Sequence, residues 1–253
     1  MVSSWEPNCV TFHGPDGCGK TTIAESLAKT ISENTELSTF KLGGSRYREW
    51  LTPDIAKDFL SDSDRLLVEP RNPNEKTDLY EDIAIACYGY AKRLVDEGNN
   101  VVIDSDPYFK RLMWSCIRLP EDDYAEYKNR LEDKMFSSIG DIGPEIVVGV
   151  NMTEIYPEKE AINLFDRITE RAGVSEYDPI GQDEVVLNIN ASTKIWEELI
   201  LKRASKRLLD ARIFTIKNEN SKPECVDTVS RDLSIKMFDK FSDVSTNRVI
   251  DIE

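Results

Sequence analysis

The chain has 253 residues, of which 47 are acidic and 32 are basic, so its formal net charge is −15. Such a negative chain repels the phosphate backbone of DNA and RNA, and we therefore expect no nucleic-acid partner. A chain of this length can bury a large core without disulfides or structural metal. No apolar run is long enough to span a membrane and no signal-peptide pattern is present, which favours a cytoplasmic protein with no membrane partner.

Cysteine and histidine usage argues against several kinds of site. The five cysteines are scattered without a Cys-x-x-Cys pair, and His13 is the single histidine of the sequence. Scattered cysteines are typical of reduced thiols in an intracellular protein. One histidine is too few for a Cys/His metal cluster, and it makes a poor basis for a nucleophilic triad.

Strand-like and helix-like patterns alternate along the chain, which predicts an α/β fold with a five-stranded parallel sheet and helices on both faces. The predicted strands cover residues 9–13, 38–42, 101–104, 145–150 and 213–216. One helix is predicted from Lys20 onward, and others over 78–97, 108–117, 121–136, 158–171, 185–206 and 225–237. We expect one domain over residues 1–241, followed by a flexible polar tail over 242–253.

The stretch Gly14-Pro15-Asp16-Gly17-Cys18-Gly19-Lys20-Thr21 has the form G-x-x-x-x-G-K-[ST]. In this pattern the glycines let backbone N–H groups face phosphate oxygens, the lysine reaches the outer phosphates, and the hydroxyl can ligate Mg²⁺. An apolar run precedes the loop and a helical pattern follows it, so the helix N-terminus adds its dipole to the anion site. The sequence therefore predicts binding of ATP and Mg²⁺ by Gly14, Asp16, Gly17, Cys18, Gly19, Lys20, Thr21 and Thr22.

A second acidic motif follows the predicted strand at 101–104, where an apolar run ends in Asp104. Its carboxylate would emerge at the carboxyl edge of the sheet beside the phosphates, and could hold Mg²⁺ together with Thr21. The alternative is that Asp104 only caps the strand or the next helix. Asp106 could be the metal-side acid instead, or could cap the helix that begins near Pro107.

Arg167 and Arg171 are four residues apart on one predicted helix face, and a polar segment follows them. This composition fits a cationic lid at about 167–183 that closes over the transferring phosphates and excludes water. The alternative is a solvated helix face on which Glu170 pairs with its neighbours.

Together these residues resemble the thymidylate kinase family of nucleoside monophosphate kinases. The phosphate loop with its internal Asp16 is similar, and so are the strand in 144–150, Tyr177-Asp178 after the two arginines, and Pro223-Glu224-Cys225-Val226. The resemblance implies a homodimer, and it implies that Asp16 binds the 3′-hydroxyl of a deoxynucleotide sugar. Gly17 stands where some members carry an arginine, which implies that Arg167 and Arg171 supply the transition-state charge from the lid.

The sequence departs from this family on the acceptor side. Members usually carry Asp-Arg-Tyr after the third strand, whereas this chain has Asp104-Ser105-Asp106-Pro107-Tyr108. The arginine that members place near the base, early in the long helix, is also missing. Lys110, Arg111, Arg46 or Arg48 could replace the lost charge, and Tyr80, Tyr88 or Tyr90 could stack on a base or belong to the core. We expect the acceptor site to use Asp16, Arg46, Arg48, Tyr88, Asp106, Lys110 and Arg111.

The sequence thus predicts an enzyme that transfers a phosphoryl group from ATP to a (deoxy)nucleoside monophosphate, with the base unassigned. Its catalytic residues would be Lys20, Arg167, Arg171 and Asp104. One alternative is a kinase for a nucleoside or another small alcohol, in which Asp104 or Asp106 acts as general base. Another is a non-catalytic nucleotide-binding relative. The sequence has no N-K-x-D motif, which argues against a signalling GTPase.

Overall fold

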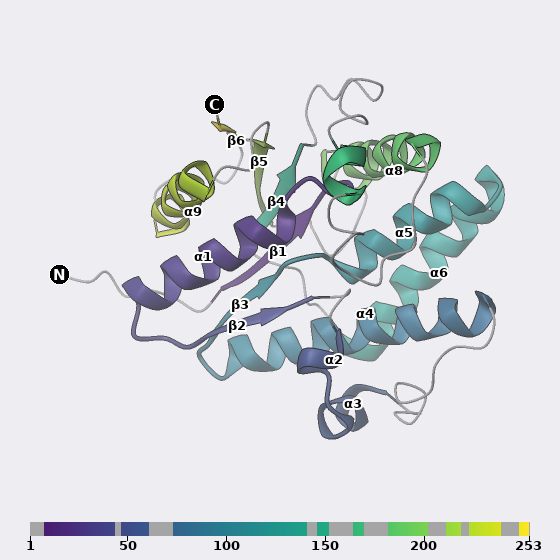
Figure 1. Cartoon of the computed structure of the whole chain (residues 1–253). Coiled ribbons are helices and arrows are strands. Elements are labelled where there is room, and N and C mark those ends of the chain that lie inside the picture. Colours follow the sequence, from purple (N-terminus) through teal and green to yellow (C-terminus); the bar gives the residue numbers. More distant parts are fainter. Residues whose placement is uncertain are drawn as a thin grey trace.

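A computed structural model of the chain describes residues 8–43, 47–60, 73–140, 146–151, 164–169, 182–201, 211–218, 223–238 and 248–252. In these residues six parallel strands form one sheet in the order β2-β3-β1-β4-β5-β6 (Figure 1). The strands are β1 (Cys9–His13), β2 (Thr39–Leu42), β3 (Asn100–Ile103), β4 (Ile146–Val150), β5 (Arg212–Asn218) and β6 (Arg248–Ile252). The predicted five-stranded parallel sheet is confirmed, and β6 extends it.

The edge strand β6 was not predicted from the sequence. It lies in the stretch that we expected to be a flexible tail, and it pairs in parallel with β5, from Phe214 opposite Arg248 to Asn218 opposite Ile252. A five-residue strand at a sheet edge has little local signal of its own, because its backbone hydrogen bonds come from the neighbouring strand.

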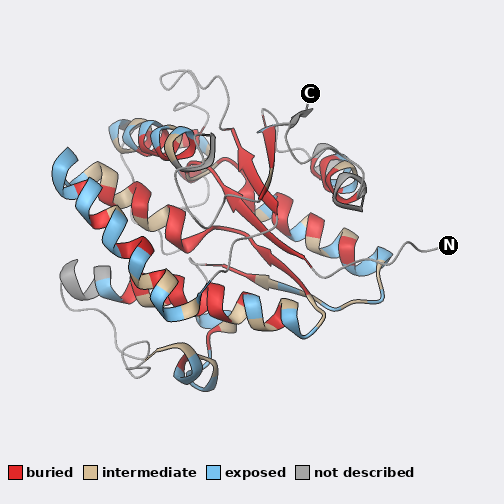
Figure 2. Cartoon of the chain, turned by 180° about the vertical axis from the view of Figure 1, so that it is seen from behind, coloured by how far each residue is buried: buried red, intermediate tan, exposed pale blue. Residues whose placement is uncertain are grey.

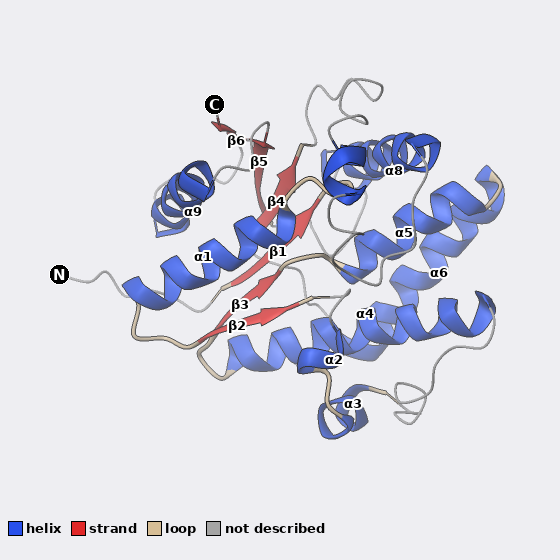
Figure 3. Ribbon diagram, in the orientation of Figure 1, coloured by secondary structure: helices blue, strands red, loops and turns tan. Residues whose placement is uncertain are grey.

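Helices cover both faces of the sheet (Figure 3). On one face lie α1 (Lys20–Asn34) and α9 (Pro223–Phe238), which pack against each other. On the other side lie α4 (Pro73–Asp96), α5 (Pro107–Arg118) and α6 (Glu121–Ile139). Helix α8 (Gln182–Ile195) packs on α5 and continues into a π-helical turn, Trp196–Leu201.

Two short helices, α2 (Tyr47–Trp50) and α3 (Pro53–Phe59), were not predicted, and α4 begins at Pro73 rather than at 78. Proline suits the first turn of a helix, because the N–H that it lacks has no helical partner there. Both α3 and α4 use this position, and Thr52 caps α3 by accepting a hydrogen bond from the Ile55 N–H.

The central strands are buried along their whole length, as Figure 2 shows. Val10 and Phe12 of β1 join the core formed with α1 and α9, whereas Cys9 joins the core formed with α4, α5 and α6. This alternation follows from the two-residue period of a strand, and burial on both faces is typical of parallel sheets. The two cores hold β1 rigidly, so the loop that leaves its carboxyl end starts from a fixed point.

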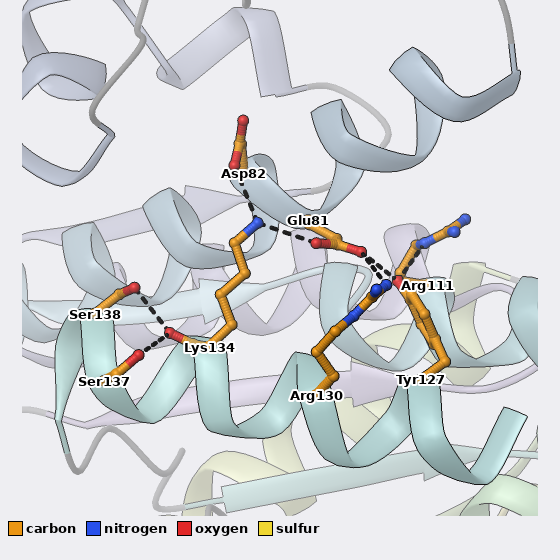
Figure 4. A network of polar contacts seen from close by, with 8 residues as sticks. All are labelled: Glu81, Asp82, Arg111, Tyr127, Arg130, Lys134, Ser137 and Ser138. Carbon is orange, nitrogen blue, oxygen red and sulfur yellow. Dashed lines mark hydrogen bonds and ion pairs between the residues drawn. The ribbon is translucent and has the colours of Figure 1, made fainter. Parts of the chain in front are cut away.

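A polar network joins α4, α5 and α6 away from the sheet (Figure 4). The Glu81 carboxylate, which is 7% exposed, accepts hydrogen bonds of 3.0 Å from the Tyr127 hydroxyl and from Lys134 Nζ, and Arg130 Nη2 lies 3.8 Å away. Arg111 Nε donates to the same Tyr127 oxygen at 2.7 Å. Burial raises the pKa of Tyr127 to about 12, with Arg111 opposing the shift and Glu81 adding to it. The phenol therefore stays protonated and donates to Glu81.

None of the described helices combines the length and the apolar composition that crossing a bilayer requires.

We predict that Glu81→Ala destabilises the protein by about 1–3 kcal/mol, because two hydrogen-bond donors and one ion-pair partner lose a largely buried carboxylate. The matched control is Glu33→Ala, which removes an i,i+4 ion pair with Lys29 from a side chain that is 63% exposed. An exposed pair of this kind contributes about 0.5 kcal/mol or less. Urea denaturation of both variants measures the difference, and equal unfolding midpoints would show that the network does not stabilise the helical layer.

Candidate functional site

The loop between β1 and α1 leaves no room for side chains at two of its glycines. Gly14 has a φ of 148° and Gly19 a φ of 93°, values that residues with a Cβ rarely adopt. A Cβ on Gly14 would lie 2.5 Å from the Val150 carbonyl oxygen, and one on Gly19 would overlap Asn218 Nδ2. The loop is therefore pressed against the carboxyl ends of β4 and β5, in the turned backbone that a phosphate-binding loop requires.

A pair of asparagines at the ends of β4 and β5 supports this loop. Asn218 Nδ2 donates to the Cys18 carbonyl oxygen at 2.8 Å. The Asn218 N–H donates to Asn151 Oδ1 at 2.5 Å, and Asn151 Nδ2 donates back to the Asn218 carbonyl oxygen at 3.2 Å. Our sequence analysis missed both residues, whose signal was a polar side chain directly at the end of a buried strand.

Lys20 is the first residue of α1 and lies at the mouth of the loop, with 8% of its surface exposed. Its Nζ donates to the carbonyl oxygens of Gly14 at 2.8 Å and Pro15 at 2.6 Å. Thr21 and Thr22 follow in the first turn of α1, half-buried and exposed respectively. Lys20, Thr21 and Thr22 thus lie at the N-terminus of α1, where the helix dipole also favours an anion.

Cys18 is fully buried inside the loop. Burial raises the pKa of its thiol, and the nearby Lys20 opposes the shift. A buried thiol with a raised pKa is a poor nucleophile. Cys18 therefore contributes packing and its backbone to the loop.

Asp16 is held between the loop, α5 and α8. Its backbone N–H donates to Asn188 Oδ1 at 3.0 Å, Asn188 Nδ2 donates to its Oδ2 at 3.4 Å, and Lys110 Nζ lies 3.6 Å from its Oδ1. Burial would raise the pKa of Asp16, but Lys110, Lys20 and Asn188 outweigh it, so the pKa lies below its usual value. Asp16 is therefore an ionised carboxylate at neutral pH, able to accept a hydrogen bond from a hydroxyl group.

Asp106 caps α5 and bonds to the end of β1. Its Oδ1 accepts hydrogen bonds from the N–H groups of Tyr108 at 2.9 Å and Phe109 at 3.3 Å, and its Oδ2 lies 3.2 Å from His13 Nε2. The helix-capping alternative for this residue is thereby confirmed. Asp106 fixes the first turn of α5, and so the position of Lys110.

A cleft opens between the loop and the start of α5. Its described lining includes two cations, Lys20 at the junction of the loop and α1 and Lys110 of α5, together with carboxylates and apolar side chains. Among the lining residues are Asp16, Lys20, Ser105, Asp106, Phe109 and Lys110. The geometry brings the phosphate loop and the predicted acceptor residues Asp16, Asp106 and Lys110 to one place.

Asp104 is 2% exposed and lies directly after β3. A Cβ on Gly43, at the end of β2, would overlap Asp104 Oδ1. Trp50 Nε1 donates to the Gly43 carbonyl oxygen at 3.0 Å, which anchors this backbone. The carboxylate is thus packed against the Gly43 backbone, a contact that the sequence analysis did not anticipate.

A helical turn over residues 164–169 packs directly on the loop and carries Arg167. A Cβ on Gly17 would lie 3.1 Å from Ile168 Cγ1 and 3.2 Å from the Leu164 carbonyl oxygen. An arginine in the place of Gly17 would have to displace this turn. Arg167 is partly buried in the turn, whereas Arg171 and Arg46 lie outside the described residues.

Three of the predicted acceptor residues are placed elsewhere. Tyr88 is 1% exposed in the core shared by α4 and the sheet, which agrees with the alternative that this tyrosine belongs to the core. Arg111 contacts Tyr127 of α6 in the network described above. Its side chain is therefore directed to α6 and not to the predicted acceptor site. Arg48 is exposed on α2 and donates to the Tyr47 hydroxyl at 3.2 Å. These outcomes leave Lys110 as the predicted replacement cation that the structure brings into the cleft.

Comparison with solved structures extends over nearly the whole chain. Deoxyadenosine kinase from M. mycoides with bound dATP is 14% identical, with a TM-score of 0.51 over 90% of this chain and 99% of that chain. Thymidylate kinase from Candida albicans is 11% identical, with a TM-score of 0.54 over 94% of this chain and 96% of that chain. The chain has the fold of the P-loop kinases. At these identities the likeness is one of fold.

Sequence comparison adds evidence for the loop region alone. The model of the ATPase family associated with various cellular activities (AAA) matches residues 10–68, which include most of β1, the phosphate loop, α1 and β2. No curated protein sequence matches the chain. Over the described ranges, no group of three or more His, Cys, Asp or Glu side chains is placed to hold a metal ion.

We predict that Gly19→Ala weakens ATP binding by about tenfold or more, because the new Cβ pushes the loop away from Asn218. Gly98→Ala is a matched control: Gly98 has a φ of 90°, and its Cβ would meet no atom within 4 Å. Both variants carry similar backbone strain of about 1–2 kcal/mol. Calorimetric titration with ATP separates them, and equal ATP affinities would mean that the close approach at Gly19 does not shape the phosphate site.

Proposed function

We propose that the protein is a kinase that uses ATP and Mg²⁺ to phosphorylate a (deoxy)nucleoside monophosphate. One observation carries this proposal: buried Lys20 of the cramped glycine loop and Lys110 of α5 line the same cleft. This arrangement puts two cations in the space where, in our proposal, a phosphoryl group moves. The P-loop kinase fold supports it, and the two solved structures named above are nucleoside and nucleotide kinases.

On the donor side, we assign the triphosphate to the loop N–H groups and to Lys20. Bound Mg²⁺ would supply positive charge that neutralises the charge developing on the transferring phosphoryl group. Kinases hold this ion with only one or two side chains besides the phosphates, and Thr21 and Asp104 are our candidates. Arg167 and Arg171 are proposed as lid residues that stabilise the transition state, supported by the packing of the 164–169 turn on Gly17.

On the acceptor side, the nucleophile is a phosphate oxygen, which needs no strong base. Lys110 would attract the acceptor phosphate and hold it in line with the donor. Asp16, ionised and facing the same cleft, would accept a hydrogen bond from a sugar hydroxyl, as the thymidylate kinase resemblance implies.

A second candidate is phosphoryl transfer to a nucleoside or another small alcohol. It is favoured by the described lining of the cleft, which holds Asp16 and Asp106 and no arginine. An alcohol acceptor needs a general base, and Asp104 after β3 is then the candidate, since both oxygens of Asp106 already contact His13 and the start of α5.

We predict that Lys20→Ala lowers kcat by about 10²–10⁴-fold, because charge on the transferring phosphoryl group loses its closest protein cation. Lys29→Ala on the same helix is the control, since that side chain is 76% exposed. Coupled ADP-release assays measure both variants. Near-normal turnover by Lys20→Ala would contradict the kinase assignment.

We predict that nucleoside monophosphates, and not nucleosides, support ADP release. With such an acceptor, we expect Lys110→Met to raise the acceptor KM by about tenfold or more and to leave the KM for ATP unchanged. Lys57→Met, at a side chain that is 63% exposed, is the control. Turnover with nucleosides alone, abolished in Asp104→Asn, would favour the alcohol kinase. Tight ATP binding with no turnover of any acceptor would favour a non-catalytic relative.

A further inference from the structure

Asn188 makes two hydrogen bonds with a residue 172 positions away in the sequence. Its Oδ1 accepts from the Asp16 backbone N–H at 3.0 Å, and its Nδ2 donates to Asp16 Oδ2 at 3.4 Å. The pattern fixes which end of the amide faces which group, because an N–H requires an acceptor and a carboxylate requires a donor. The amide of Asn188 therefore matches both the backbone and the side chain of Asp16.

Asn188 is held firmly in its place. It is 4% exposed, and its neighbour Ile189 is fully buried in the core that α8 shares with α1 and α9. About two turns further on, Ile195 and Trp196 are buried in the core on the other side. Because side chains of this helix are buried in both cores, packing fixes the part of α8 that carries Asn188, and the Asp16 side chain meets the amide at that place.

The Asp16 carboxylate is held at both of its oxygens. Asn188 occupies Oδ2, and Lys110 Nζ lies 3.6 Å from Oδ1. Helices α8 and α5, which pack against each other, thus fix the plane of one carboxylate in the phosphate loop. The side chain keeps 27% of its surface exposed, and Asp16 lines the cleft where the acceptor would lie.

We infer that Asn188 is a positioning residue that orients Asp16 toward a hydroxyl group of the acceptor sugar. This inference rests on the proposed function, in which Asp16 binds that hydroxyl. Asn188 contacts Asp16 rather than the cleft, since it is absent from the cleft lining and acts through the carboxylate. It makes the acceptor geometry depend on α8, the helix that follows the expected lid.

The test is a double-mutant cycle between Asn188→Ala and Asp16→Ala, assayed with a panel of deoxynucleoside monophosphates and their 3′-deoxy analogues. We expect Asn188→Ala to lower kcat/KM for acceptors with a 3′-hydroxyl by about tenfold or more, through the acceptor KM, as for one hydrogen bond to a charged group. Its effect should shrink to about twofold or less in the Asp16→Ala background and with the 3′-deoxy analogues. An equal loss in both backgrounds would overturn the inference.

Asn190→Ala is the matched control, because Asn190 lies on the same helix with its side chain exposed. It should leave all rates unchanged. Asn188→Asp is the second variant, nearly equal in volume, and it replaces the donor Nδ2 by an oxygen that repels the Asp16 carboxylate. If Asn188→Ala does not fold, the same cycle is run with Asn188→Asp, and additivity there overturns the inference as well.

A readout without turnover separates this inference from the proposed function. Carboxyl ¹³C NMR of Asp16 reports its pKa, which should rise in Asn188→Ala because a donor to the carboxylate is lost, while Lys110 and Lys20 still face it. If no acceptor is turned over but the Asp16 pKa moves, the proposed function fails and the positioning contact stands. If acceptors are turned over while neither the cycle nor the pKa responds, the inference fails alone.

Discussion

The close approach of the phosphate loop to the ends of β4 and β5 is the constraint on which the rest of the site depends. Gly14 and Gly19 lie so near the Val150 carbonyl and Asn218 that neither tolerates a Cβ. The turned backbone of a phosphate loop is costly for ordinary residues, and it persists here because neighbouring strands over-determine it. This packing also fixes the position of Lys20 at the start of α1. The proposed donor side of the site depends on that position.

The proposed acceptor side of the cleft is formed by residues that helices position, rather than by Asp104 at the end of β3. Asp106 uses both oxygens to hold α5 against His13, so its role is to place Lys110. Lys110 and Asn188 then hold Asp16, the loop residue that faces the cleft. The chain has a net charge of −15, and the cleft holds Lys20 and Lys110 beside the carboxylates of Asp16 and Asp106. Under the proposed function, the two lysines are the local cations that would attract the phosphates.

The charged residues of the outer helical layer tie helices together, whereas other charged residues line the cleft. Glu81 gathers Tyr127, Lys134 and Arg130 between α4 and α6, and Arg111 joins through the same phenol. Arg111 directly follows Lys110 in the sequence, but consecutive residues on a helix point about 100° apart. One cation therefore lines the cleft while its neighbour ties the helices together.

The sequence by itself determined what depends on neighbouring residues: the phosphate loop, five of the strands and the main helices. These features follow from local backbone preferences and from the periods of strand and helix. Only the tertiary structure decided which distant groups meet. Asn188 bonds to Asp16 across 172 positions and Asn218 to Cys18 across 200, and Gly43 leaves room for the Asp104 carboxylate. No local pattern encodes such contacts, nor the addition of β6 to the sheet, because each is stabilised by a partner that only the fold brings near.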